Sequence, residues 1–211
     1  MCFSDRPDVV YDGELFDKQL VDLLDVLHIA GKVDLIGASM GGPIVATFAC
    51  RHPDRVHTVS FFDPGYSKGG QQIPFRLRAP ILGEFNFETM AGAFPRNQLA
   101  DFKHPEKFPT WPNRYLLQMQ FRGFRRALLS TLRNYVATDW SKDYACVGGQ
   151  STPVFLVWGK SDRDVPFETS KEVLAAIPRA QFLPVEDAAH VPFIEHPEIV
   201  NPAMLQFLSF H

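Results

Sequence analysis

The chain has 211 residues, a length that fits one domain of ordinary size with room for a subordinate insertion. Apolar residues make up 45% and charged residues 21%, a globular balance that excludes disordered, fibrous and repeat-array proteins. The formal net charge of −3 gives no indication of a nucleic-acid partner or of attraction to an anionic membrane.

Three cysteines stand far apart in the sequence, at Cys2, Cys50 and Cys146. They are too few and too scattered to predict a disulfide framework, and no C-x-x-C pair offers the spacing of a metal site. The first residues lack the basic and apolar regions of a signal peptide, and no apolar run reaches the ~18 residues of a membrane span. We therefore expect a cytoplasmic protein with reduced cysteines and without a metal.

Helical and extended patterns alternate outside the middle of the chain, with Asp12 as the expected cap of the first helix. The predicted elements in chain order are a helix over 14–30, a strand over 33–36, a helix over 40–51, strands over 56–62 and 153–158, a helix over 168–176 and a strand over 181–185. Such alternation is typical of α/β proteins with a parallel sheet.

Residues 64–150 follow a different pattern, in which strands stop, Pro and Gly interrupt the chain, and helical stretches such as 115–135 appear. The segment has 12 Lys and Arg against 6 Asp and Glu. We expect residues 64–150 to form a helical cap or lid on a core of residues 1–63 and 151–211. Its arginines favour a solvated basic face over contact with a membrane; they include Arg114, Arg122, Arg125, Arg126 and Arg133.

The strongest motif is GASMG at residues 37–41, a G-x-S-x-G between an apolar run and a helical stretch. Gly37 and Gly41 are expected to avoid collisions where strand and helix approach each other in a strained turn. Such a turn exposes the Ser39 hydroxyl, and the following helix presents the backbone N–H of Met40 to a developing oxyanion. The pattern predicts a serine nucleophile.

Together with two later segments, this motif resembles the α/β-hydrolase fold family, of the serine esterase, lipase and C–C hydrolase type. Residues 158–166, WGKSDRDVP, are similar to the family's W-G-x-x-D-x-x-x-P, which puts Asp162 in the place of the catalytic acid. Residues 187–198, DAAHVPFIEHPE, are similar to A-G-H-x-x-x-x-E-x-P-E, which puts His190 in the place of the base. Asp164 and Asp63 remain alternative acids.

The resemblance implies acyl transfer in two steps. His190 would take the proton of Ser39 as the hydroxyl attacks a carbonyl, while Asp162 fixes the imidazole tautomer, and water would then release the acyl-enzyme. The expected substrate is a small, largely apolar carboxylic ester, with no cofactor. A C–C bond hydrolase or an amidase would use the same triad, and a catalytically impaired fragment or binding module that keeps the hydrolase pocket is the alternative of another class.

The resemblance begins in the middle of the family's pattern. Residues 4–7, SDRP, are similar to the loop after the fourth strand, so the preceding strands and the loop that donates a second oxyanion N–H have no counterpart. We expect a partial α/β-hydrolase fold in which the nucleophile strand has an exposed edge, open to self-association. An incomplete gene product, which we favour, and a shortened protein that completes its sheet by oligomerising both fit this expectation.

Overall fold

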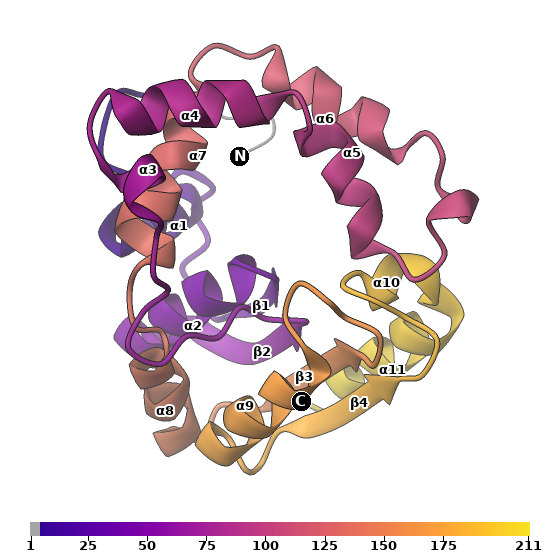
Figure 1. Cartoon of the computed structure of the whole chain (residues 1–211). Coiled ribbons are helices and arrows are strands. Elements are labelled where there is room, and N and C mark those ends of the chain that lie inside the picture. The colour runs from indigo at the N-terminus through magenta and orange to yellow at the C-terminus, as the bar shows by residue number, and fades with distance from the viewer. Residues whose placement is uncertain (1–4) are drawn as a thin grey trace.

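The computed structural model describes residues 5–211 (Figure 1), so Cys2 and Ser4, named above, lie outside the described residues. Four strands form one parallel sheet in the order in which they occur along the chain. They are β1 (Val33–Ala38), β2 (Val56–Phe62), β3 (Val154–Gly159) and β4 (Gln181–Val185). The predicted α/β class with a parallel sheet is confirmed, and β2 and β4 have the predicted limits.

Helices cover both faces of the sheet because successive strand residues are apolar on both sides. On one face, Phe61 and Leu156 belong to a core that is completed by α1 (Gly13–Val26), α2 (Gly41–Arg51), α8 (Ser141–Gly149) and α9 (Ser170–Ala176). On the other face, Phe62 and Val157 pack with α11 (Pro197–Phe210). Every residue of β3 is buried, which places the centre of the molecule at this strand.

β1 is an edge strand, with β2 as its neighbour on one side and no strand on the other in residues 5–211. Its residues Asp34, Ile36 and Ala38 are exposed, and Ile36 retains 55% of its accessible surface. The exposed edge expected for the nucleophile strand is therefore present. Self-association through this edge stays a prediction.

The first helix begins as predicted but ends early. The Asp12 side chain accepts a hydrogen bond of 2.9 Å from the N–H of Leu15, as expected of a capping residue. The helix ends at Val26 instead of residue 30, and His28 takes a left-handed φ of 54°. The apolar spacing continues past Val26, so the pattern alone did not reveal this turn.

Several short helices occupy the chain between β2 and β3: α3 (Phe75–Arg78), α4 (Leu82–Ala91), α5 (Phe94–Asn97), 3-10 turns at Gln98–Asp101 and Pro105–Lys107, α6 (Trp111–Met119), α7 (Phe124–Thr131), a π-helical turn at Leu132–Val136, and α8. In Figure 1, α4, α5 and α6 lie on the opposite side of the molecule from α8 and α9. The helix predicted over 115–135 is broken at Gly123, whose φ of 82° separates α6 from α7. The domain limits at 63/64 and 150/151 stay a prediction.

Cys50 and Cys146 form a disulfide, which contradicts the expectation of reduced cysteines. Their Cα atoms are 5.7 Å apart although 96 positions separate them in the sequence, because α2 packs against α8. Disulfides persist in oxidising compartments, so the bond removes one of the two grounds on which a cytoplasmic location was expected, the reduced state of the cysteines. No helix within residues 5–211 combines the length and the apolar character needed to cross a bilayer.

Removal of the disulfide by Cys50→Ser with Cys146→Ser is expected to lower the free energy of unfolding by about 2–4 kcal/mol, because the unfolded chain regains a long open loop. Urea unfolding of the oxidised protein and the double variant measures the difference. Cys2→Ser, which changes the cysteine outside the pair, is the control. Equal urea midpoints for the oxidised protein and the double variant would contradict the prediction.

Candidate active site

Ser39 lies in a sharp turn between β1 and α2, with a left-handed φ of 50°. Few residues other than glycine adopt this backbone conformation unless their surroundings hold it in place. The Ser39 N–H donates to the Phe62 carbonyl at 3.0 Å, and the Ser39 carbonyl accepts from Gly42 at 2.9 Å and Gly65 at 2.8 Å. The strained turn is thus anchored to the chain that follows β2, and Ser39 is only half-buried.

The close approach of strand and helix falls on Gly37 and Gly42. A Cβ atom on Gly37 would lie 2.3 Å from the carbonyl oxygen of Gly41, and a Cβ atom on Gly42 would lie 2.4 Å from Cβ of Pro64. A Cβ atom on Gly41 would meet nothing within 4 Å, so the collision expected at this position is absent. The close contact between α2 and the loop after β2 therefore falls on Gly42, one residue after the Gly41 of the motif.

Met40 caps the N-terminus of α2, with φ −58° and ψ −24°. The first N–H groups of a helix have no acceptor within it, and the helix dipole favours negative charge at this end. The Met40 N–H, directly after Ser39, is therefore placed to interact with an anion that forms at the serine.

His190 and Asp162 form a buried pair in the loops that follow β4 and β3. His190 Nδ1 lies 2.8 Å from Asp162 Oδ2, and the Asp162 side chain is fully buried. Asp162 Oδ1 accepts the backbone N–H groups of Asp164, at 2.8 Å, and Val165, at 3.0 Å. Of the three candidate acids, the structure places Asp162 on the imidazole, while Asp164 supports it through a backbone N–H.

Opposing influences act on the pKa of His190. Burial lowers this pKa, but the hydrogen bond and the charge of Asp162, with smaller contributions from Asp164 and Asp101, raise it above its ordinary value. The surroundings of His190 therefore favour the imidazolium form. A histidine that must accept a proton during a reaction benefits from this stabilisation.

Asp63, the other alternative acid, is completely buried just behind this pair. Its Oδ1 accepts the Gly159 N–H at 2.8 Å, and one oxygen of Asp63, one of Asp162 and one ring nitrogen of His190 lie within 4.8 Å of one another. These atoms are a donor set that metals accept, but the imidazole and the Asp162 carboxylate already hydrogen-bond each other. We therefore assign no metal here.

Asp101 is a site residue that the sequence analysis missed. The backbone carbonyl of Asp101 accepts a hydrogen bond of 2.9 Å from the backbone N–H of His190. Burial, followed by a hydrogen bond with Asp164 and the charge of that residue, raises the pKa of the Asp101 carboxyl to about 7. Asp101 belongs to no motif and reaches His190 only through folding of the segment between β2 and β3, so sequence spacing held no signal for it.

A second contact ties the same segment to the histidine loop. The carboxylate of Glu195 accepts the backbone N–H groups of Lys103 at 2.7 Å, His104 at 3.3 Å and Ala189 at 2.7 Å. Residues 101–104 are thus joined to both ends of the loop that carries His190. These contacts hold residues 101–104 beside His190.

Ser39, Asp162 and His190 all follow the carboxyl ends of parallel strands, which is the edge at which sheets of this kind bind ligands. Within residues 5–211 no hydrogen bond joins the Ser39 hydroxyl to His190. The structure therefore forms the pair of His190 and Asp162 and the strained turn of Ser39 as two separate parts.

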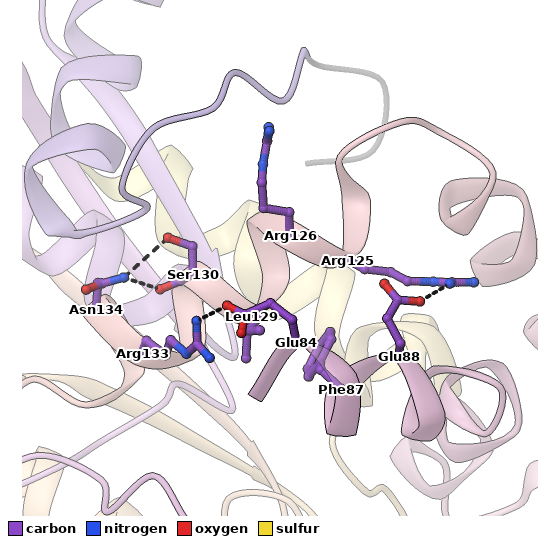
Figure 2. A pocket seen from close by; sticks show the side chains of 9 residues that line it. All are labelled: Glu84, Phe87, Glu88, Arg125, Arg126, Leu129, Ser130, Arg133 and Asn134. Carbon is purple, nitrogen blue, oxygen red and sulfur yellow. Dashed lines mark hydrogen bonds and ion pairs between the residues drawn. The ribbon is translucent and has the colours of Figure 1, made fainter. Parts of the chain in front are cut away.

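A cavity of about 180 Å³ lies between α4 and α7, and neither Ser39 nor His190 lines it (Figure 2). Its three arginines are already paired with acidic side chains: Arg125 with Glu88, Arg126 with Asp8 and Arg133 with Glu84. Because these charges are compensated, the cavity offers no unpaired arginine for an anionic ligand among its described residues.

Known proteins resemble this chain along nearly all of its length. The family model described as "Alpha/beta hydrolase family" matches residues 3–203. Lipase 1 of Psychrobacter immobilis is 27% identical over 189 residues, which cover 88% of this chain and 58% of the lipase. A 2-hydroxy-6-oxononadienedioate/2-hydroxy-6-oxononatrienedioate hydrolase of Escherichia coli (strain K12) is 24% identical over 202 residues, which cover 91% of this chain and 66% of the relative. The chain thus spans less than two thirds of either relative.

Solved structures share the fold. The enol-lactonase from Burkholderia xenovorans LB400 superposes with a TM-score of 0.79 at 20% identity, over 98% of this chain and 76% of the lactonase. The esterase EaEST from Exiguobacterium antarcticum gives a TM-score of 0.77 at 18% identity, over 98% and 77% of the two chains. The resemblance inferred from residues 37–41, 158–166 and 187–198 is confirmed at the level of the family. With its fold and a family match over residues 3–203, this chain belongs to the alpha/beta hydrolase family.

Proposed function

We propose that the protein is a serine hydrolase that cleaves a small, largely apolar carboxylic ester through an acyl-enzyme on Ser39. The observation that carries this proposal is the buried pair of His190 and Asp162, at 2.8 Å, on the sheet edge where Ser39 occupies a strained turn. A nucleophile, a base and a group that orients the base are the parts that acyl transfer needs. Hydrolase relatives support the reaction class.

In the proposed reaction, the bond of Asp162 to Nδ1 keeps a proton on that nitrogen and leaves Nε2 of His190 free as the base. Nε2 takes the Ser39 proton as the hydroxyl oxygen attacks the ester carbonyl, and the N–H of Met40 stabilises the oxyanion. The imidazolium returns the proton to the leaving alcohol, and water repeats the sequence to release the acid. Hydrogen bonds of this kind often form only when substrate is bound, so Ser39 and His190 need to approach each other at that stage.

The carboxyl groups around His190 favour a substrate without negative charge at the base. Asp164, in the loop after β3, and Asp101, in the segment between β2 and β3, both raise the pKa of His190 by their charge. The same charges repel a carboxylate in this position. A neutral ester therefore fits this site better than a dioate of the kind that gives the E. coli relative its name.

Ser39→Ala is expected to lower kcat/KM for p-nitrophenyl butyrate by at least about 10³-fold, because the nucleophile is lost. Steady-state hydrolysis and labelling of Ser39 by a fluorophosphonate measure the effect. Ser209→Ala, a change at an exposed serine of α11, is the control and keeps full activity. A folded wild-type protein that neither hydrolyses the ester nor takes the label would refute the proposed function.

The acid limb of the pH profile is expected to report His190. Protonated imidazole cannot accept the Ser39 proton, so kcat/KM falls as the pH drops through the pKa of His190, which lies above its ordinary value. Asp162→Asn removes the negative charge and is expected to move this limb to lower pH while reducing kcat. The measurement is kcat/KM for a neutral ester across the pH range in which the protein stays folded. A wild-type limb below about pH 6.5 would argue against His190 as the base.

Asp101→Asn is expected to raise kcat/KM for an anionic ester relative to kcat/KM for a neutral ester. Above its pKa of about 7 the Asp101 carboxyl is ionised and repels a carboxylate, whereas below this value it is protonated. The ratio of kcat/KM for a p-nitrophenyl hemisuccinate to that for the butyrate should therefore rise about threefold to tenfold at high pH and less at low pH. Asp22→Asn, at an exposed site on α1, is the control. An unchanged ratio at high pH would exclude Asp101 from substrate selection.

A further inference from the structure

Asp63 is a buried carboxyl group that the proposed reaction does not use. It directly follows β2, has none of its surface exposed and adopts a left-handed φ of 43°. One oxygen, Oδ1, accepts the Gly159 N–H at 2.8 Å. The other, Oδ2, is buried and has no hydrogen-bond donor within residues 5–211. A carboxylate is strongly disfavoured in its ionised form when one of its oxygens is buried without a hydrogen-bond donor.

The ionisable groups that face Asp63 are Asp162, Glu195 and His190. Burial raises the pKa of Asp63 well above its ordinary range, and the charge and hydrogen bond of Asp162 and the charge of Glu195 raise it further. The N–H of Gly159 opposes this rise but does not offset it. His190 is the one group among the three that can carry positive charge, and Asp162 already holds it.

One oxygen of Asp63 and one oxygen of Asp162 lie within 4.8 Å of each other. Two carboxyl groups that share a buried site in this way do not both ionise, so one of them keeps a proton. Asp162 is the better anion, because it receives three hydrogen bonds, from the N–H groups of Asp164 and Val165 and from His190. Asp63 receives one, from Gly159. The proton therefore stays on Asp63.

We propose that Asp63 is a neutral carboxylic acid whose Oδ2–H donates a hydrogen bond to the carboxylate of Asp162, and that it acts as a positioning residue for the pair of Asp162 and His190. The orphaned Oδ2 then becomes a satisfied donor. This inference deepens the proposed function, on whose base and acid it rests. The donated hydrogen bond spreads the charge of Asp162, which limits how strongly Asp162 holds the proton of His190.

The position of Asp63 in the chain links it to the nucleophile as well. The residue before it, Phe62, accepts the N–H of Ser39, and Gly65 donates to the Ser39 carbonyl. Asp63 itself accepts a hydrogen bond from Gly159, the last residue of β3, and Asp162 lies in the loop that follows. One turn of the chain thus connects the serine with the group that orients its base.

The test compares two replacements that tolerate the left-handed backbone. Asp63→Asn keeps an acceptor for Gly159 and an N–H donor for Asp162, and kcat/KM for p-nitrophenyl butyrate should stay within about threefold of wild type. Asp63→Gly relieves the backbone strain but removes the donor, and kcat should fall about 10-fold to 100-fold with KM little changed. Its acid limb should also move to higher pH, because Asp162 then holds the imidazolium more tightly. Loss of stability alone would not move this limb.

Infrared spectroscopy tests the proton without any need for turnover. The folded wild-type protein should show the carbonyl band of a neutral carboxylic acid at about pH 8, and Asp63→Asn should remove it. Absence of the band, an acid limb unmoved in Asp63→Gly, or an inactive but folded Asp63→Asn beside an active wild type would overturn the inference. If the wild type hydrolyses no ester while the band is present and lost in Asp63→Asn, the proposed function fails and the assignment of the proton stands.

Discussion

The contact between the Ser39 turn and the end of β2 is the constraint on which the rest of the site depends. A serine with a φ of 50° is stable only because the Phe62 carbonyl and the Gly65 N–H hold its backbone on both sides. The absence of side chains at Gly37 and Gly42 lets α2 come close enough for this geometry. Packing of strand, helix and following loop therefore produces the strained turn at Ser39, rather than any property of serine itself.

The carboxyl groups near His190 differ in how readily they ionise. Several acids crowd one imidazole, and the structure resolves their repulsion by giving Asp162 the hydrogen-bond donors that stabilise a charge. Burial and the neighbouring acids raise the pKa of Asp63 and of Asp101 instead. Carboxyl groups that keep their protons add polarity to the site without adding the same amount of negative charge. The number of acidic residues near His190 thus overstates the charge that a substrate meets.

Much of the fold could be predicted because strands of a parallel sheet leave short runs rich in β-branched and aromatic residues, as at residues 56–62 and 153–158. The motifs around Ser39, Asp162 and His190 are local and could be found for the same reason. Features that depend on contacts between distant segments could not. The disulfide requires α8 to lie on α2, Gly123 breaks a helix where the chain meets residue 6, and Asp101 reaches His190 through the folding of the segment between β2 and β3. No spacing rule contains these distances.

The free edge of β1 has a consequence for motion. β2 and β3 are hydrogen-bonded on both sides, whereas β1 has one neighbouring strand in the described part of the chain and ends at Ala38, directly before Ser39. Local opening needs the fewest broken hydrogen bonds at such a strand, so amide hydrogens of β1 should exchange with solvent sooner than those of β3. Every excursion of β1 carries Ser39 with it, whereas Asp162 follows β3, which is paired on both sides. The position of Ser39 relative to His190 is therefore coupled to an edge strand, and any chain that pairs with the β1 edge would restrict the motion of Ser39.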